Sequence, residues 1–129
     1  MVVKKVIVAT EKAPKAIGPY SAAVKAGNLV FTAGQLGIDP DSGDFVPGGI
    51  EAQTKKALEN LSAVLDAAGT SLANVVKTTV FLDDMDDFSD MNGIYGQFFT
   101  ENFPARSAVQ AAKLPKGGLV EIEAVALLS

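Results

Sequence analysis

The stretch Ile50–Gly69, IEAQTKKALENLSAVLDAAG, predicts a long helix, and the rest of the fold is deduced around it. Glu51 stands four residues before Lys55, as in a stabilising helical ion pair, and Gly69 suits the left-handed end of a helix. Residues at helical spacing form one mainly apolar stripe: Ile50, Thr54, Ala57, Leu58, Leu61, Leu65 and Ala68. A helix with a single apolar stripe must bury it against another element, so we expect a sheet beneath it.

Apolar, β-branched runs on both sides of this helix predict the strands of that sheet. Before the helix they cover about residues 2–9, Ala22–Lys25 and Leu29–Ala33, with Ala26-Gly27-Asn28 suited to a hairpin turn. The run Val75–Leu82 follows the helix. The first third of the chain is therefore expected to be rich in strands.

A second helix is predicted to begin near Asp86 or Asp87, where acidic residues favour the start of a helix. Its apolar residues share one broad face: Phe88, Met91, Tyr95, Phe98 and Phe99. Two extended runs follow, Ser107–Ala111 and Leu119–Leu128, separated by the turn residues 114–118. The element order β-β-β-α-β-α-β-β predicts an α+β fold, with two helices on one face of a mixed sheet.

The last run also predicts an oligomer. Both alternating sides of Leu119–Leu128 are largely apolar, whereas a monomer with one wet sheet face would place polar residues on that side. We therefore expect another subunit to cover the second face of the sheet.

Composition predicts one domain over residues 1–129 and excludes several kinds of site. The 129 residues are 48% hydrophobic and contain neither a repeat nor a linker. Cysteine and histidine are absent, so Ser-His and Cys-His nucleophile pairs and ordinary zinc sites cannot form. The acidic run Asp83–Asp87 lacks the spacing of a calcium loop, and Gly48-Gly49 and Gly117-Gly118 match no nucleotide-binding pattern. We expect no metal and no cofactor.

Charge and the first residues bear on partners and location. The net charge is −4 and the lysines are scattered, which argues against nucleic acid as the main ligand. Two lysines interrupt the short apolar start, residues 1–8, so it resembles neither a signal peptide nor a membrane span. We expect a cytoplasmic protein.

Arg106 is the first candidate site residue, because it is the only arginine among eleven basic residues. A planar guanidinium can bind a carboxylate through two parallel hydrogen bonds, which lysine cannot do. It follows Pro104, which fixes the backbone at the entrance to a strand. An ordinary structural salt bridge is the alternative interpretation.

Glu121 is the second candidate, because its neighbours along the predicted strand are mostly apolar. A carboxyl group there would either pair with a cation or have a raised pKa, and a raised pKa suits a general acid or base. The alternative is that Glu121 and Glu123 simply face solvent.

Weaker candidates come from three other segments. Tyr20 follows Gly18-Pro19, where its hydroxyl could meet a ligand or its ring could simply pack. Ala33 and Gly34 end a strand in small residues, which leaves room for a ligand or forms a tight turn. Asn92 lies at the edge of the second helix's apolar stripe, where a surface role is equally consistent with its position.

Taken together, five segments resemble the RidA/YjgF family of reactive-intermediate deaminases, in order and over about residues 9–126. They are Ala16–Ser21 (AIGPYS), Thr32–Gln35 (TAGQ), Asn74–Val80 (NVVKTTV), Asn102–Ser107 (NFPARS) and Glu121–Ala126 (EIEAVA). The resemblance implies a chorismate-mutase-like fold and a homotrimer whose sheets surround a central barrel, with sites in the clefts between subunits. It also implies hydrolysis of 2-imino acids and their enamine tautomers, such as 2-aminoacrylate, 2-iminopropanoate and 2-iminobutanoate, to 2-oxo acids and ammonia.

The same resemblance assigns roles to residues. Arg106 corresponds to the carboxylate-binding arginine, and Glu121 to the glutamate that orients water. Tyr20 and Asn92 correspond to ligand-proximal residues of the family. The backbone around Ala33, Gly34 and Ala108 is expected to complete the pocket, although many relatives have serine at position 33 and cysteine at position 108.

Two rival functions remain at this point. The first is a non-catalytic trimer that senses small 2-oxo acids through Arg106 or acts like a chaperone, and the retained Glu121 favours catalysis over it. The second is a ribonuclease or translation inhibitor, against which the acidic balance and the absence of histidine both weigh.

Overall fold

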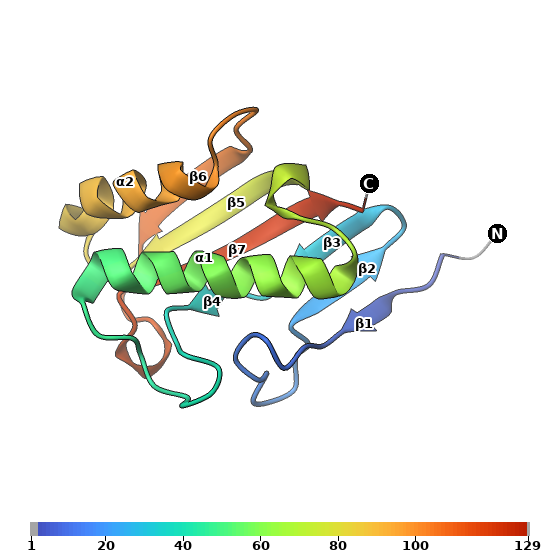
Figure 1. The fold of residues 1–129 in the computed structure, drawn as a ribbon, viewed down its shortest axis with the longest axis horizontal. Helices are drawn as coiled ribbons and strands as arrows, with labels where there is room; N and C mark the ends of the chain where they lie inside the picture. Colours follow the sequence, from blue (N-terminus) through green and yellow to red (C-terminus); the bar gives the residue numbers. More distant parts are fainter. Residues whose placement is uncertain (1–2, 129) are drawn as a thin grey trace.

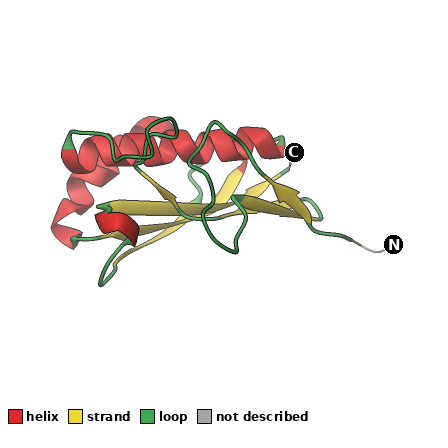
Figure 2. Ribbon diagram, turned by 90° about the horizontal axis from the view of Figure 1, so that it is seen from below, coloured by secondary structure: helices red, strands yellow, loops and turns green. Residues whose placement is uncertain are grey.

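Two helices cover one face of a sheet in the computed structural model, which describes residues 3–128 (Figures 1 and 2). The helices are α1 (Gly49–Ala68) and α2 (Phe88–Phe98). The strands are β1 (Val6–Val8), β2 (Ala23–Ala26), β3 (Leu29–Thr32), β4 (Gln35–Leu36), β5 (Val75–Leu82), β6 (Ala105–Gln110) and β7 (Val120–Leu127). Short 3-10 turns occupy Leu72–Asn74, Met85–Asp87 and Pro115–Gly117. The predicted α+β class is confirmed.

The strands run in the order β1-β2-β3-β7-β5-β6, and β4 also pairs with β7. Only β5 and β6 are parallel, because α2 carries the chain back between them, so the sheet is mixed as predicted. The side chains of α1 that face the sheet are fully buried, among them Leu58, Leu61 and Leu65, and the helix packs mainly on β7, β4 and β3. No described helix is long and apolar enough to cross a membrane.

Three strands differ most from the sequence prediction. The strand predicted at about residues 2–9 covers only Val6–Val8 of the described residues, and residue 2 lies outside them. The predicted strand Ser107–Ala111 starts earlier, at Ala105, because β6 pairs with β5 from the residue directly after Pro104, so Arg106 lies inside the strand. The short strand β4 was not predicted. Its two residues resume pairing with β7 after Ala33-Gly34, and two residues give no periodicity that a sequence pattern could detect.

The break between β3 and β4 is a β-bulge. From Phe31 to Gln35 the chain advances four residues, whereas their partners on β7, Val125 and Ile122, are three apart. The Ala124 N–H of β7 donates to the Thr32 Oγ1 instead, at 3.0 Å. A bulge changes the direction of nearby side chains, and here it sets the backbone of Ala33-Gly34 beside β7.

No α-helix among residues 3–128 covers the opposite face of the sheet, and only loops and a short turn reach that side (Figure 2). Apolar side chains on it remain exposed, with Phe31 and Val109 nearly half accessible to solvent. The uncovered apolar face is the feature from which the sequence predicted an oligomer.

Asn60 of α1 holds the segment that follows the bulge. Its Nδ2 donates to the carbonyl oxygens of Leu36 and Ile38, both at 2.9 Å, and the side chain is buried. Gly37 lies between Leu36 and Ile38 in the sequence. A Cβ on Gly37 would come within 2.6 Å of the Gln53 Cα, so the backbone of this segment touches α1 directly. Asn60 therefore supplies both carbonyl groups with a side-chain donor from α1.

We predict that Asn60→Leu lowers the free energy of unfolding by about 3 kcal/mol, because two buried carbonyl groups lose their donors. Urea unfolding followed by circular dichroism, at one fixed protein concentration, measures the change. The exposed residue Lys55 on the same helix supplies the control, since Lys55→Ala should change stability by less than about 0.5 kcal/mol. Equal stability of the two variants would contradict the role given to Asn60.

Candidate functional site

The two main candidates lie on opposite faces of the sheet. Arg106 is paired with Thr78 of β5, whose side chain is buried beneath α2, so the arginine side chain points to the helix side. Glu121 is paired with Phe81 and stands next to Ile122, which is buried on the helix side, so the glutamate points to the uncovered side. The two side chains therefore cannot meet around one ligand within a single subunit.

Arg106 is held by Asn92 of α2. The Arg106 Nη1 donates to the Asn92 Oδ1 at 2.7 Å. Within residues 3–128 the only ion pair joins Lys56 and Glu59, so the structural salt bridge considered for Arg106 is not formed there. Because a hydrogen bond to a neutral amide leaves the positive charge uncompensated, Arg106 remains available to bind an anion.

A hollow of about 420 Å³ adjoins the guanidinium at the end of α2. It is lined by Asn92, Tyr95, Gly96, Phe99, Phe103, Pro104 and Arg106. Ala108 lies on the same side of β6 as Arg106, since it pairs with the buried Val80, and its methyl group packs against the core. Ala108 thus belongs with the arginine, on the helix side.

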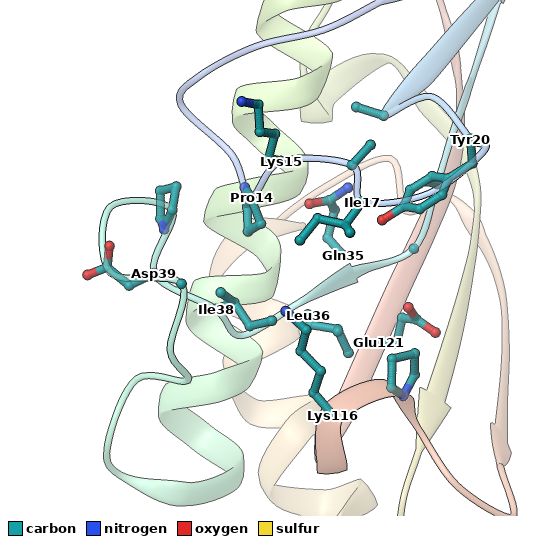
Figure 3. Close-up of a pocket in the computed structure, with 17 residues that line it drawn as sticks. Pro14, Lys15, Ile17, Tyr20, Gln35, Leu36, Ile38, Asp39, Lys116 and Glu121 are labelled. Atoms are coloured by element: carbon teal, nitrogen blue, oxygen red, sulfur yellow. The ribbon is translucent and has the colours of Figure 1, made fainter.

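Glu121 lines a separate and larger cavity, of about 660 Å³, beside β4 (Figure 3). Tyr20, Ala33 and Gly34 line the same cavity. One interpretation of the sequence was that the Tyr20 ring simply packs. Tyr20 is 56% exposed, so its ring does not pack into its own subunit. The predicted residues are therefore divided into an arginine group and a glutamate group.

Gly34 permits the position of the glutamate. A Cβ on Gly34 would lie 2.7 Å from the Glu121 Cδ and 2.8 Å from its Oε2, closer than van der Waals contact allows. The carboxyl group therefore rests directly on the Gly34 backbone, which the bulge brings into place. The sequence also allowed a tight turn at this segment. The close approach of the Glu121 carboxyl group, and not a turn, is what requires glycine at position 34.

Burial raises the pKa of Glu121 above the 4.5 of an unperturbed glutamate, and the negative charge of Glu123 on the same face raises it further. Glu121 is thus not a fully solvated carboxylate, which was the alternative considered for it. A carboxyl group that changes protonation state nearer to neutral pH can both donate and accept a proton.

Sequence reasoning did not single out Gln35. It lines the Glu121 cavity and is only 6% exposed, whereas in the sequence it was noted only as the last residue of the segment TAGQ. Lys116 also lines this cavity, with its backbone in the left-handed region at φ 58°. A turn rich in glycine was visible at this point in the sequence, but nothing there indicated which residue would take that conformation. The described residues contain no cluster of metal-ligating side chains.

Comparisons with known proteins give one consistent family. The sequence pattern of the Endoribonuclease L-PSP family matches residues 10–128. A RutC family protein of Pyrococcus horikoshii is 55% identical over 122 residues, which make up 95% of this chain and 97% of that protein. The 2-iminobutanoate/2-iminopropanoate deaminase of Bos taurus is 54% identical over 121 residues, 94% of this chain and 88% of that protein.

A solved structure agrees with these sequences. The crystal structure of RidA from an Antarctic Psychrobacter species superposes with a TM-score of 0.91 at 47% identity. The alignment covers 95% of this chain and 98% of that one. The similarity therefore extends over nearly the whole chain.

We predict that Glu123→Gln lowers the pKa of Glu121 relative to its pKa in the unsubstituted protein, because the substitution removes the neighbouring negative charge. The carboxyl ¹³C shift of Glu121, followed by NMR against pH, measures both values. Glu51→Gln on the exposed first turn of α1 serves as the control and should leave the Glu121 titration unchanged. An unchanged Glu121 titration in Glu123→Gln would refute the predicted effect of the neighbouring charge.

Proposed function

The chain belongs to the Endoribonuclease L-PSP family, in its RidA/YjgF branch, and from this premise we propose that it hydrolyses 2-imino acids and their enamine tautomers to 2-oxo acids and ammonia. The substrates of this proposal are 2-aminoacrylate, 2-iminopropanoate and 2-iminobutanoate. One observation of the structure supports it above the others: Arg106 carries an unneutralised charge on a side chain already fixed by Asn92. Such a group suits the carboxylate that every one of these substrates carries.

The proposed chemistry needs only a positioned carboxylate and one acid–base group. Arg106 binds the substrate carboxylate and so fixes the adjacent C2 atom. For an enamine, protonated Glu121 gives its proton to C3, which produces the imine. Glu121 then accepts a proton from water as the water oxygen adds to C2, and passes that proton to nitrogen. The C–N bond breaks and ammonia leaves as the hydroxyl group on C2 gives its proton back to Glu121, which forms the carbonyl group of the 2-oxo acid.

We further propose that the site forms between subunits of a homotrimer. Arg106 and Glu121 lie on opposite faces of one sheet, so each subunit supplies half of two different sites. A contact between the Arg106 side of one copy and the Glu121 side of the next joins unlike surfaces, and three such contacts related by a threefold rotation close into a trimer. The exposed apolar residues of the uncovered face, such as Phe31 and Val109, would be buried in the same assembly. A cytoplasmic location remains a prediction.

No observation of the structure favours the rival functions. A ribonuclease would need a surface that attracts phosphate groups, whereas the net charge is −4. A pure sensor would need Arg106 but would not require a glutamate of raised pKa resting on a glycine.

The first test generates 2-iminobutanoate in situ with a dehydratase and follows the appearance of 2-oxobutanoate. We expect the protein to accelerate this step. Arg106→Lys should raise KM about tenfold, since it keeps the charge but loses the two-pronged contact. Glu121→Gln should lower kcat by roughly 10²-fold or more, because it removes the acid–base group.

Glu51→Gln and Lys55→Ala, both exposed on α1, are the matched controls for these two substitutions. Binding of 2-oxobutanoate without any acceleration would replace the proposal with the sensor. Cleavage of purified RNA that depends on Arg106 would replace it with the ribonuclease.

The second test mixes two inactive variants, Arg106→Ala and Glu121→Gln, after joint refolding. If each site takes its arginine from one subunit and its glutamate from the next, random assembly restores about one quarter of the unsubstituted activity. Size-exclusion chromatography with light scattering should show a trimer. If exchange of subunits is demonstrated and the mixture is still no more active than its separate components, the proposal of a shared site is contradicted.

A further inference from the structure

The Arg106 guanidinium also lies over two aromatic rings of α2. Its central carbon is 4.7 Å from the centre of the Tyr95 ring and 5.4 Å from the centre of the Phe88 ring. We propose that Tyr95 and Phe88 are positioning residues, which fix the plane of this guanidinium so that it meets the substrate carboxylate in one orientation. The inference rests on the proposed function and concerns how the arginine is prepared for it.

The spacing of residues on α2 explains how three contacts reach one side chain. Phe88, Asn92 and Tyr95 are separated by four and then three residues, so they follow one face of the helix. The rings restrain the flat ion on its face, while the Asn92 Oδ1 holds Nη1 at its edge. Face and edge contacts together limit both tilting and rotation, whereas either one alone leaves one of these motions free.

Tyr95 is itself fixed from below. Its hydroxyl oxygen lies 2.7 Å from the Thr78 Oγ1 in a buried hydrogen bond, and its ring packs on Phe99 with centres 4.6 Å apart. Thr78 is the residue of β5 that pairs with Arg106. The arrangement is therefore a closed loop of contacts from β5 through α2 to β6, and it anchors the arginine to the buried core.

We expect these contacts to increase the affinity for the ligand, because they reduce the entropy that the arginine side chain loses on binding. A free arginine side chain loses rotational freedom when it grips a ligand, and a side chain held in advance loses less. A guanidinium has five N–H donors, and Asn92 takes one, so the others can face the ligand. Burial is the main reason that the pKa of Tyr95 is raised, so the hydroxyl keeps its proton and its bond to Thr78.

The first experiment uses the fact that Arg106 is the only arginine. Protein labelled with ¹⁵N-arginine gives a single side-chain Nε–H signal per subunit type, which reports on this guanidinium alone. We expect a signal displaced by the ring currents of Tyr95 and Phe88 and a rigid Nε–H in the heteronuclear NOE. Tyr95→Leu and Phe88→Leu should each move the signal toward the position of a free arginine and increase its mobility.

Phe98→Leu supplies the matched control. It removes a ring from the same helix, and the rings that lie against the guanidinium are those of Phe88 and Tyr95. Phe88 is only half-buried, so its variant keeps the inference testable even if Tyr95→Leu fails to fold. A rigid, ring-shifted signal that persists in folded Phe88→Leu and Tyr95→Leu proteins would overturn the proposal. This readout requires no turnover, so it is independent of whether the deaminase activity is found.

The second experiment separates positioning from general destabilisation. Each ring deletion should raise KM for 2-iminobutanoate about three- to tenfold with little change in kcat, as expected for a cation–π contact. Tyr95→Phe, which keeps the ring, should recover most of the affinity lost in Tyr95→Leu. In an Arg106→Lys background the ring deletions should have little further effect on KM, because the flat ion is gone. Equal losses in both backgrounds would mean that the rings act only through stability, and would overturn the proposal.

Discussion

The alternation of side chains along each strand is the constraint on which the rest of this structure depends. Because α1 and α2 both lie on one face, every second residue of β5 and β7 is buried, including Thr78, Val80 and Ile122. The residues between them, Glu121 among them, must point to the uncovered face. The same rule turns Arg106 toward α2. A single chain therefore presents two incomplete sites, and an assembly of copies is the direct way to complete them.

An irregularity in this regular sheet shapes the glutamate side. The bulge at Ala33-Gly34 adds one residue opposite β7 and brings a backbone without a side chain against the Glu121 carboxyl group. Asn60 then binds the carbonyl groups of Leu36, in β4, and of Ile38 just beyond it. The cavity beside Glu121 consequently rests on a buried amide of α1, so the stability of the helix and the geometry of the site are coupled.

Local patterns predicted much of this fold, and contacts distant in sequence account for what they missed. The helical stripe placed α1 to within one residue, and the β-branched run Val75–Leu82 matches β5 at both ends. The strand β4 is too short to have a pattern of its own. Arg106 and Glu121 could be named from their chemistry and from a family resemblance. Their placement on opposite faces follows from pairing with β5, and the sequence alone did not establish that register.

The proposed assembly would also change how Glu121 ionises. In one subunit, burial and Glu123 both raise its pKa. An arginine of the next subunit would act in the opposite direction, since a cation within about 4–6 Å lowers a carboxyl pKa by roughly 1 to 3. A bound substrate carboxylate neutralises that cation and removes its effect, so binding would restore the raised pKa of Glu121. The protonated form would then be favoured when an enamine carbon is in place to receive the proton. An arginine held rigidly by Asn92 and two rings suits this coupling, because a mobile cation would approach the glutamate at variable distances.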